Sequence, residues 1–396
     1  MTCDTDDLTN KKPAYPIRDA FQSFYNDYAS EHSLSRAQAK TAACILSCKT
    51  GMLGYTVEEC PNCGNVKIHA RSCNNRSCPC CQAPAEQKWI MERDAELISG
   101  MAYYHVVFTL PSELNPLMLE NQKLLYGLIF SAASDTLITL CKDKKYMGAL
   151  PGIVSVLHTW GQKLNFHPHL HVMLSGGGIT PGHKLVKTRH KGFIIPVKAI
   201  GRMFRGKFMD KLKSFYKAGQ LELAGAASKY SDPDCWQSLV DTLYSKEWMP
   251  FVKETFNGNG NAIKYLARYA YRTAISNSRV VAVDTEDVTI SYKDYADGSK
   301  HKQMTFKGTE FIHLFLQHVL PAGVHRVRFS GFLANCKKAK MLTLIGQLIQ
   351  TPYVGSPTKG KSMSELLLLL YGTDICTCPI CRHRMQAYVI RAPVRM

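Results

Sequence analysis

Hydrophobic positions in the first hundred residues are spaced as in helices, except in one Cys-rich stretch. The spacing predicts helices within 16–50 and over 84–99, with the Cys-rich stretch at 55–82 between them. The character of the chain then changes at 103–110, where β-branched and aromatic residues precede Pro111. This pattern predicts a strand that stops at the proline.

The middle of the chain predicts one long helix, two strands and a further helical region. The helical spacing covers about 112–142, and strands are expected at 153–160 and 169–174, joined by a short polar loop. Residues 180–250 are mixed and basic. We interpret them as a mostly helical insertion.

A Gly-Asn-Gly-Asn sequence at 258–261 interrupts the chain before its last third. Asn261 is a suitable N-cap for a helix over about 262–275. Strands are expected at 279–283 and 288–292, followed by a turn at Asp297-Gly298. Helical segments and a second small group of cysteines complete the chain.

Length and charge narrow the class of protein. A chain of 396 residues predicts two or three domains, and 45% hydrophobic residues with 20% charged residues predict a folded protein. The formal net charge of +18 indicates a polyanionic partner. Nucleic acid is the usual one, because Lys and Arg displace counterions from phosphates. The alternative is a basic surface that serves only solubility.

Cysteine usage and the chain start predict a cytosolic protein. Residues 1–10 are acidic and polar and lack the apolar core of a signal peptide. The longest purely aliphatic run, at 366–370, is far below the roughly 20 residues that span a bilayer. Six of the fifteen cysteines lie between Cys60 and Cys81. In a reducing cytosol this clustering indicates metal binding rather than disulfides, and no membrane partner is expected.

The Cys-rich stretch contains two Cys-x2-Cys pairs. Cys60 with Cys63 and Cys78 with Cys81 are separated by fourteen residues, a spacing that supplies four thiolates to a tetrahedral Zn²⁺. We predict one structural zinc ion on these four residues; the alternative is free thiols in a small core. The surplus candidates are Cys73, which is the first substitute ligand, Cys80 and His69. A weaker candidate for another ion is the C-terminal group Cys376, Cys378, Cys381 and His383.

A His-Leu-His sequence opens one of the predicted strands. Residues two apart in a strand face the same side, so His169 and His171 can bind one divalent ion while Leu170 enters the core. Structural histidines are the alternative. A third ligand must come from elsewhere in the chain. Gln162, in the preceding loop, is the first candidate, and His158 on the partner strand is the second.

The predicted helix at 262–275 carries two tyrosines one turn apart. At about 100° per residue, Tyr265 and Tyr269 share a face with Arg268 and Arg272, whereas Tyr271 points elsewhere. Two hydroxyl groups beside two guanidinium groups are suited to attack on a phosphodiester. The alternative is an aromatic stripe that only packs on a sheet. The buried stripe of this helix is expected at Leu266, Ala270 and Ala274.

Residues 355–362 match the phosphate-binding pattern Gly-x4-Gly-Lys-Ser. A functional loop of this kind follows a strand and opens a helix within a parallel sheet of well over ~100 residues. Only 34 residues follow Ser362, and residues 341–350 before it have helical spacing. We therefore expect no nucleotide cofactor and interpret the segment as a basic loop near DNA.

Taken together, the motifs resemble those of the two-tyrosine HUH transposases of the insertion sequence 91 family, where HUH denotes His, a bulky apolar residue, and His. One departure is Ser77, where the family is expected to carry His beside the zinc knuckle. The segments that carry the resemblance are 72–82, 107–111, 158–162, 167–171, 265–277, 292–295 and 331–335.

The resemblance implies an α+β fold with an HUH-endonuclease core, in which helices cover a central antiparallel sheet. It implies three domains: a helical, zinc-binding one at 1–100, the nuclease at 101–330 and a largely helical C-terminal region at 331–396. It also implies Mg²⁺ or Mn²⁺ at His169 and His171, and Tyr265 and Tyr269 as nucleophiles.

The implied activity is rolling-circle transposition through 5′-phosphotyrosine intermediates. The partners would be single-stranded DNA and transposon ends, in the bacterial cytosol at the nucleoid. Two alternatives remain at this stage. One is a replication initiator or relaxase with the same chemistry, and the other is a non-catalytic zinc-finger DNA-binding regulator.

Overall fold

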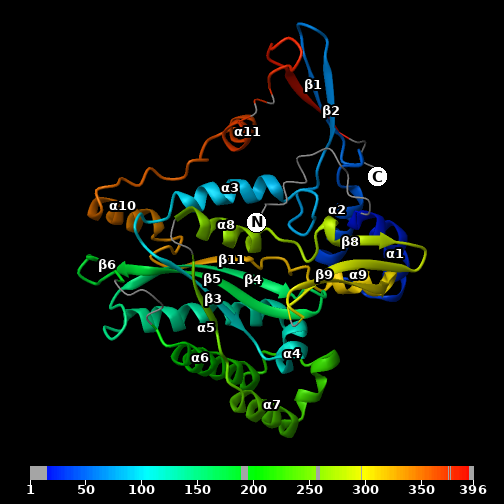
Figure 1. Ribbon diagram of the computed structural model, residues 1–396. Coiled ribbons are helices and arrows are strands. Elements are labelled where there is room, and N and C mark those ends of the chain that lie inside the picture. Colours follow the sequence, from blue (N-terminus) through cyan, green and yellow to red (C-terminus); the bar gives the residue numbers. More distant parts are fainter. Residues whose placement is uncertain are drawn as a thin grey trace.

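The protein is described here from a computed structural model, which covers residues 16–188, 195–255, 259–295, 297–372, 374 and 376–391 (Figure 1). Within these residues the fold is α+β, and the strands pair antiparallel in three sheets. The fold class expected from the resemblance is therefore confirmed. Short 3-10 helices occur at Ser112–Leu114, Gly225–Ser231 and Asn277–Arg279.

The largest sheet forms the centre of the molecule. Its strand order is β11-β4-β5-β3-β7, and β6 pairs with β5 beyond the end of β3. β4 and β5 are buried along nearly their whole length, because helices cover both faces of the sheet (Figure 1). The strands are β3 (Tyr103–Thr109), β4 (Leu150–Trp160), β5 (Phe166–Ile179), β6 (Leu185–Lys187), β7 (Phe251–Thr255) and β11 (Val327–Gly331).

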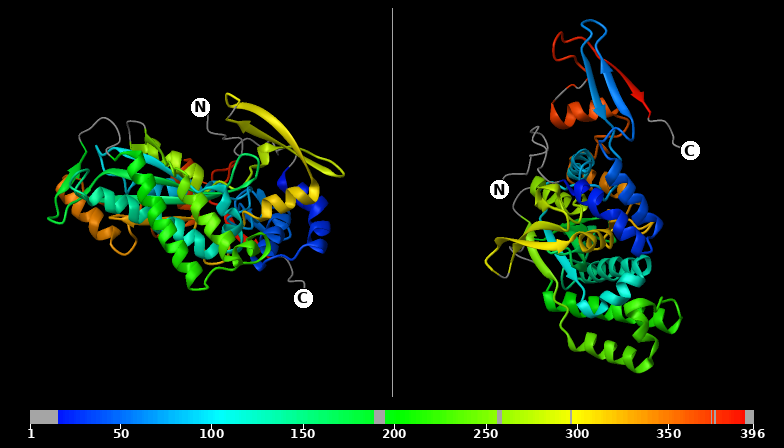
Figure 2. Two further views of the ribbon diagram at one scale, coloured as in Figure 1. Left: turned by 90° about the horizontal axis from the view of Figure 1, so that it is seen from below. Right: turned by 90° about the vertical axis from the view of Figure 1, so that its right-hand side faces the viewer.

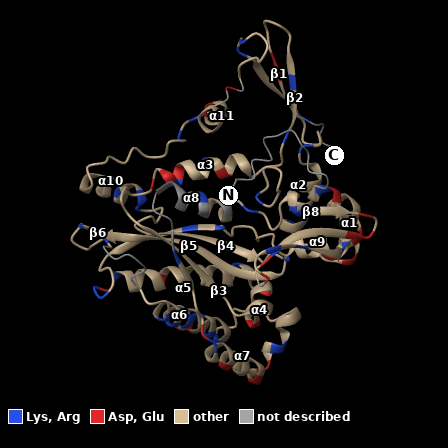
Figure 3. Ribbon diagram, viewed as in Figure 1, with Lys and Arg blue, Asp and Glu red and all other residues tan. Residues whose placement is uncertain are grey.

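The face below the sheet in Figure 1 is covered by the largest apolar core. α5 (Gln122–Lys142) packs on β4, and α6 (Val197–Lys217) packs on α5. α5 is the one helix in the described ranges that is long and apolar enough to cross a membrane; 61% of its apolar window is buried inside the protein. α6 carries many Lys and Arg (Figure 3). α4 (Asn115–Glu120) and α7 (Pro233–Ser245) complete this side.

The other face of the sheet carries α3 (Ala83–Asp94), α8 (Asn259–Ala270) and α10 (Lys338–Leu348). The tyrosine helix was expected over about 262–275, but α8 begins at Asn259 and ends at Ala270. The guanidinium of buried Arg326 donates hydrogen bonds to the carbonyls of Ala270 and Arg272, at 3.5 and 3.0 Å. These bonds satisfy acceptors that a helix end leaves free, so the chain can leave the helix there.

A second sheet and the N-terminal helices form a lobe beside the central sheet. α1 (Ile17–Glu31) packs on α9 (Gly308–Leu316), with the rings of Phe21 and Phe315 5.2 Å apart. The N-terminal helices therefore share a core with elements from the last third of the chain. The remaining elements of this lobe are α2 (Arg36–Ser47), β8 (Val280–Val283), β9 (Asp287–Asp294) and β10 (Lys300–Lys307). The β9–β10 hairpin extends outward (Figure 2).

The third sheet stands away from the body and joins the two ends of the chain (Figures 1 and 2). It has the order β12-β1-β2, formed by β1 (Tyr55–Glu59), β2 (Val66–Ala70) and β12 (Gln386–Ile390). α11 (Met363–Tyr371) lies between this sheet and α10. Ser362, in the segment that matches the phosphate-binding pattern, is the N-cap of α11 and forms a capping box with Glu365.

Candidate active site and cysteine clusters

Three histidines converge on the two central strands of the largest sheet. His169 and His171 share one face of β5, and His158 of β4 lies directly opposite His169 in the strand register. One ring nitrogen from each histidine lies within 4.8 Å of the others. The second candidate for third ligand, His158, therefore joins the pair. Gln162, the first candidate, lines the adjoining cavity, where its backbone carbonyl accepts a hydrogen bond from Arg279.

One nitrogen of each ring is already engaged. Nε2 of His158 donates to the carbonyl of Tyr269 at 2.6 Å, and Nδ1 of His169 donates to the carbonyl of His167 at 2.7 Å. Each bond fixes the tautomer and leaves one nitrogen lone pair for a ligand.

The ring of His171 is in contact with a fourth histidine, His105. Nδ1 of His171 lies 2.9 Å from Nε2 of His105 on β3, and the two rings are nearly parallel. Nε2 of His171 faces Nε2 of His169 at 3.1 Å. Two metal-bound nitrogens at right angles, each about 2.1 Å from a cation, would be about 3 Å apart. The donor set and its spacing fit one divalent cation.

Burial keeps these imidazoles neutral. Desolvation lowers the pKa of His169 to about 4 and that of His105 to about 4. It also lowers the pKa values of His158 and His171, and the neighbouring histidines lower them further. At neutral pH the ligand nitrogens therefore carry lone pairs rather than protons, as metal binding requires.

Tyr269 brings a hydroxyl-bearing ring to the histidines. Its ring stacks on His171 with centroids 3.7 Å apart. Tyr271 points away and packs against Trp89 of α3, at 6.2 Å between centroids, as its helical position predicts. Tyr265 and Arg268 belong to α8, but their side chains lie outside the described part of the structure.

A cavity of about 500 Å³ opens beside the histidines and Tyr269. Arg272 lines it although it lies beyond the end of α8. Arg279, which the sequence analysis did not single out, also lines it; burial lowers its pKa to about 10, so it stays cationic at neutral pH. The remaining charged and aromatic lining side chains are Lys163, Lys293, Asp294, Trp160, Tyr292 and Tyr295. The cavity is thus basic and rich in aromatic rings.

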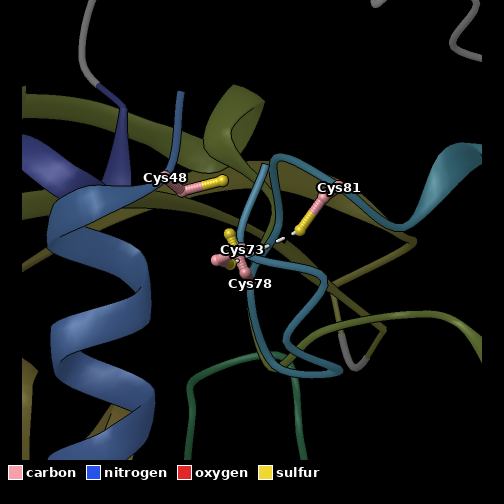
Figure 4. A group of neighbouring side chains, drawn as sticks. All are labelled: Cys48, Cys73, Cys78 and Cys81. Carbon is pink, nitrogen blue, oxygen red and sulfur yellow. Dashed lines mark hydrogen bonds between the residues drawn. The ribbon is translucent and has the colours of Figure 1, made fainter. Parts of the chain in front are cut away.

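Within the described residues, eight cysteines form two groups of four, which divide the four predicted zinc ligands between them. Cys78 and Cys81 gather with Cys48 and Cys73 (Figure 4), and their sulfur atoms lie within 4.8 Å of one another. Cys60 and Cys63 do not join them. They lie at the tip of the β1–β2 hairpin, whereas Cys73, Cys78 and Cys81 follow its base. Five-residue strands separate tip from base by about 16 Å, too far for one ion.

Cys48 is the ligand candidate that sequence reasoning missed. It is the C-cap of α2, and its position near the end of the predicted helical range 16–50, shortly before the Cys-rich stretch, was the available signal. Cys73, the substitute ligand, lies in the group, with its sulfur 3.6 Å from that of Cys81. Cys80 instead accepts a hydrogen bond from Asn277 at 3.4 Å. Ser77, where the family was expected to have His, is buried beside this group.

Comparisons with known proteins cover most of the chain. A family profile described as "Transposase zinc-binding domain" matches residues 20–110, and one described as "Putative transposase" matches residues 152–340. The protein named "Putative transposase y4qJ" from Sinorhizobium fredii is 37% identical over 380 residues, 94% of each chain. The transposase for insertion sequence element IS801 from Pseudomonas savastanoi pv. phaseolicola is 28% identical over 96% of this chain and 91% of its own. No solved structure matches this chain.

These findings define a DNA-processing enzyme of the transposase class that carries a zinc-binding module. The chain belongs to the insertion sequence 91 family of transposases, as its motifs indicated. The family's zinc-binding domain and the clustered cysteines together support structural zinc.

Proposed function

We propose that this transposase cleaves and rejoins single-stranded DNA at the ends of its mobile element through 5′-phosphotyrosine intermediates. The observation that carries the proposal is the position of Tyr269, whose ring lies against His171 within a cluster of three neutral histidines. Because its substrate is DNA, we expect the protein to act at the bacterial nucleoid.

In this proposal His158, His169 and His171 hold Mg²⁺ or Mn²⁺. The fit rests on three neutral imidazoles that each offer a nitrogen within 4.8 Å of the others, while a ring nitrogen of each is oriented by Tyr269, His167 or His105. When bound, the cation supplies Lewis-acid stabilisation of the charge that develops on the scissile phosphate.

Tyr269 is the first proposed nucleophile, because its ring lies against His171. Its hydroxyl oxygen attacks the phosphorus and the phenol proton is released to water. The bond between phosphorus and the 3′ oxygen breaks, and the departing 3′ oxygen takes up a proton. Arg272 and Arg279 line the same cavity, so their charges are available to orient and neutralise the phosphate. The new tyrosine–phosphate bond conserves the energy of the broken one, so rejoining needs no ATP.

The lining of the cavity supports single-stranded rather than duplex DNA as the proposed substrate. Tyr292 and Tyr295, at the end of β9, offer aromatic faces, and Tyr295 is 68% exposed. Lys163 lies over the ring of Tyr292 with its ammonium 5.0 Å from the centroid. Alternating cations and exposed rings bind the backbone and the unpaired bases of a single strand.

Tyr265 is the proposed second nucleophile, because it precedes Tyr269 by one helical turn on α8. Two tyrosines allow one strand end to stay attached while another strand is cut. Strand transfer between two substrates therefore distinguishes this proposal from a DNA-binding regulator, which would cut nothing. The match to transposases along 94% of the chain favours element ends over plasmid origins as substrates.

The proposal is tested with single-stranded oligonucleotides that carry element-end sequences. Mg²⁺-dependent cleavage is expected with the wild-type protein, and loss of cleavage with retained DNA binding is expected for His169→Ala and His171→Ala. Full Mg²⁺-dependent cleavage by the double Ala variant would refute the metal assignment. Tyr271→Phe is the matched control, because Tyr271 packs on Trp89 away from the cavity.

A further inference from the structure

Two segments far apart in the sequence adopt the same local conformation in the sheet that stands away from the body. Both have the sequence Cys-Pro-x-Cys: residues 60–63 connect β1 to β2, and residues 378–381 precede β12. The residue after each second cysteine has a left-handed backbone, with φ of 69° at Gly64 and 63° at Arg382. Left-handed φ is uncommon for Arg, so the turn is imposed by its surroundings.

The backbone hydrogen bonds of the two segments also correspond. The amide of Gly64 donates to the carbonyl of Cys60 at 2.9 Å, and the amide of Arg382 donates to that of Cys378 at 3.0 Å. The first cysteine of each segment donates its own amide to a carbonyl five residues later, at 2.9 and 2.8 Å. Each segment is therefore a knuckle with the same backbone hydrogen bonds.

The two knuckles face each other. The sulfur of Cys60 lies 3.3 Å from that of Cys381, and the sulfur of Cys63 lies 3.6 Å from that of Cys378. All four sulfurs lie within 4.8 Å of one another. Thiolates around a tetrahedral zinc ion, each about 2.3 Å from it, are about 3.8 Å apart. The side-chain amide of Asn65 donates toward the sulfur of Cys378 at 3.8 Å, as a second-shell donor to a thiolate would.

Apolar packing alone does not account for the stability of this sheet. Its core cluster comprises the buried residues Cys60, Cys378 and Met385, with Cys381 packed against them. Large apolar side chains of the sheet are instead half exposed, among them Val66, Ile68, Tyr388, Val389 and Ile390. A unit with so small a core needs another source of stability, and a bound metal ion is one of the common ones.

We propose that Cys60, Cys63, Cys378 and Cys381 hold a second structural zinc ion, which joins the two ends of the chain. This site is separate from the group of Cys48, and it does not depend on the proposed nuclease chemistry. It replaces the grouping expected from the sequence, in which Cys378 and Cys381 would have bound an ion with Cys376 and His383. The zinc would fix β12 against β1, in the register that pairs Tyr55 with Ile390.

The first test measures zinc in the purified full-length protein. Two ions per chain are expected, one for each group of four cysteines. Cys60→Ser/Cys63→Ser and Cys378→Ser/Cys381→Ser should each lose one ion, and all four substitutions together should still lose only one. Cys376→Ser is the matched control and should keep both. A Cys378→Ser/Cys381→Ser variant that keeps as much zinc as the wild-type protein would overturn the proposal.

A second measurement, cysteine alkylation, uses the wild-type protein. It therefore tests the proposal even if a variant fails to fold. Alkylation under reducing conditions should modify the exposed Cys235 and Cys336 at once. Cys60, Cys63, Cys378 and Cys381 should resist until a chelator is added and then react together. Reaction of the four cysteines before the chelator is added, in protein that protects them when the reductant is left out, would identify disulfides instead. Reaction of Cys378 while Cys60 stays protected would also contradict a shared ion.

Discussion

The ring of Tyr269 stacks on the imidazole of His171, with centroids 3.7 Å apart and planes 23° apart. The carbonyl of Tyr269 also accepts the hydrogen bond that orients His158. One residue at the end of α8 therefore touches two of the three clustered histidines, once through its side chain and once through its backbone. This arrangement ties the geometry of the candidate metal site to the position of a candidate nucleophile.

The third metal ligand can be identified by titration with Mn²⁺. His158→Ala is expected to weaken Mn²⁺ binding strongly, because it removes a nitrogen that lies within 4.8 Å of the other two. Gln162→Ala should have a small effect, because the contact of Gln162 to Arg279 uses its backbone carbonyl. Calorimetric titration of both variants compares them directly. A larger loss of affinity in Gln162→Ala would reverse the assignment.

His105 is expected to position His171. Metal binding through Nε2 of His171 requires its proton on Nδ1, where Nε2 of His105 can accept it at 2.9 Å. His105→Phe keeps an aromatic ring and removes the acceptor, so Mn²⁺ affinity should fall about 10- to 100-fold, as is typical of second-shell changes. His105→Asn retains an acceptor and should recover part of the loss. Equal affinities in the wild type and the Phe variant would show that the contact is only structural.

The elements around this site were largely predictable, because their pattern is local. β3, β4 and β5 lie where β-branched and aromatic runs predicted strands, and two-residue spacing put His169 and His171 on one face. The contribution of His105 was not predictable, since a single His in an apolar strand resembles any core residue. The end of α8 depends on Arg326, which lies 56 residues beyond Ala270.

The grouping of the cysteines likewise depends on contacts between distant parts of the sequence, which a local pattern does not predict. The spacing of the cysteines within 60–81 identified the zinc-binding stretch. It wrongly assigned Cys60 and Cys63 to the same ion as Cys78 and Cys81. The partners of Cys60 and Cys63 lie more than 300 residues away in the sequence, at Cys378 and Cys381. The pairing of β1 with β12 brings them together. Contacts at such separation leave no periodic trace in a single sequence.

We also predict that the cysteine group of Cys48, Cys73, Cys78 and Cys81 binds a zinc ion that stabilises the fold. Cys48→Ser should lose one zinc ion per chain and lower the melting temperature, because a structural zinc contributes directly to folding. Cys44→Ser is the matched control; Cys44 lies one turn earlier on α2 and outside the group. Zinc analysis and calorimetry of the two variants check this. If Cys44→Ser lost zinc and Cys48→Ser did not, the ligand set would be wrong.

Stability should fall as the solution is acidified. Burial lowers the pKa values of His105, His169 and His318 to about 4, from an ordinary value of 6.5. Between those values the unfolded chain binds protons that the folded chain does not, so the free energy of unfolding decreases as pH falls. The slope is up to about 1.4 kcal/mol per pH unit for each such histidine.

Urea unfolding without added divalent ions, at steps from pH 7 to pH 5, measures this slope. His318→Gln removes one of the buried histidines and should flatten the dependence relative to the wild type. The side chain of His318 bonds to Thr159 and to the carbonyl of Leu164, so this variant also lowers stability uniformly. Identical slopes in the two proteins would contradict the neutral, buried state of His318.

The most direct test of the account is to map the covalent bond between protein and DNA. A single-stranded substrate labelled 3′ of the nick should leave a denaturation-resistant adduct on Tyr269 or Tyr265, identified by mass spectrometry of the labelled peptide. Tyr269→Phe should keep some cleavage but lose strand transfer, because one hydroxyl cannot hold two ends. Tyr265→Phe/Tyr269→Phe should form no adduct, since Phe keeps the ring and removes only the nucleophile. An adduct on Tyr271, or one that persists in the double Phe variant, would contradict the proposed mechanism.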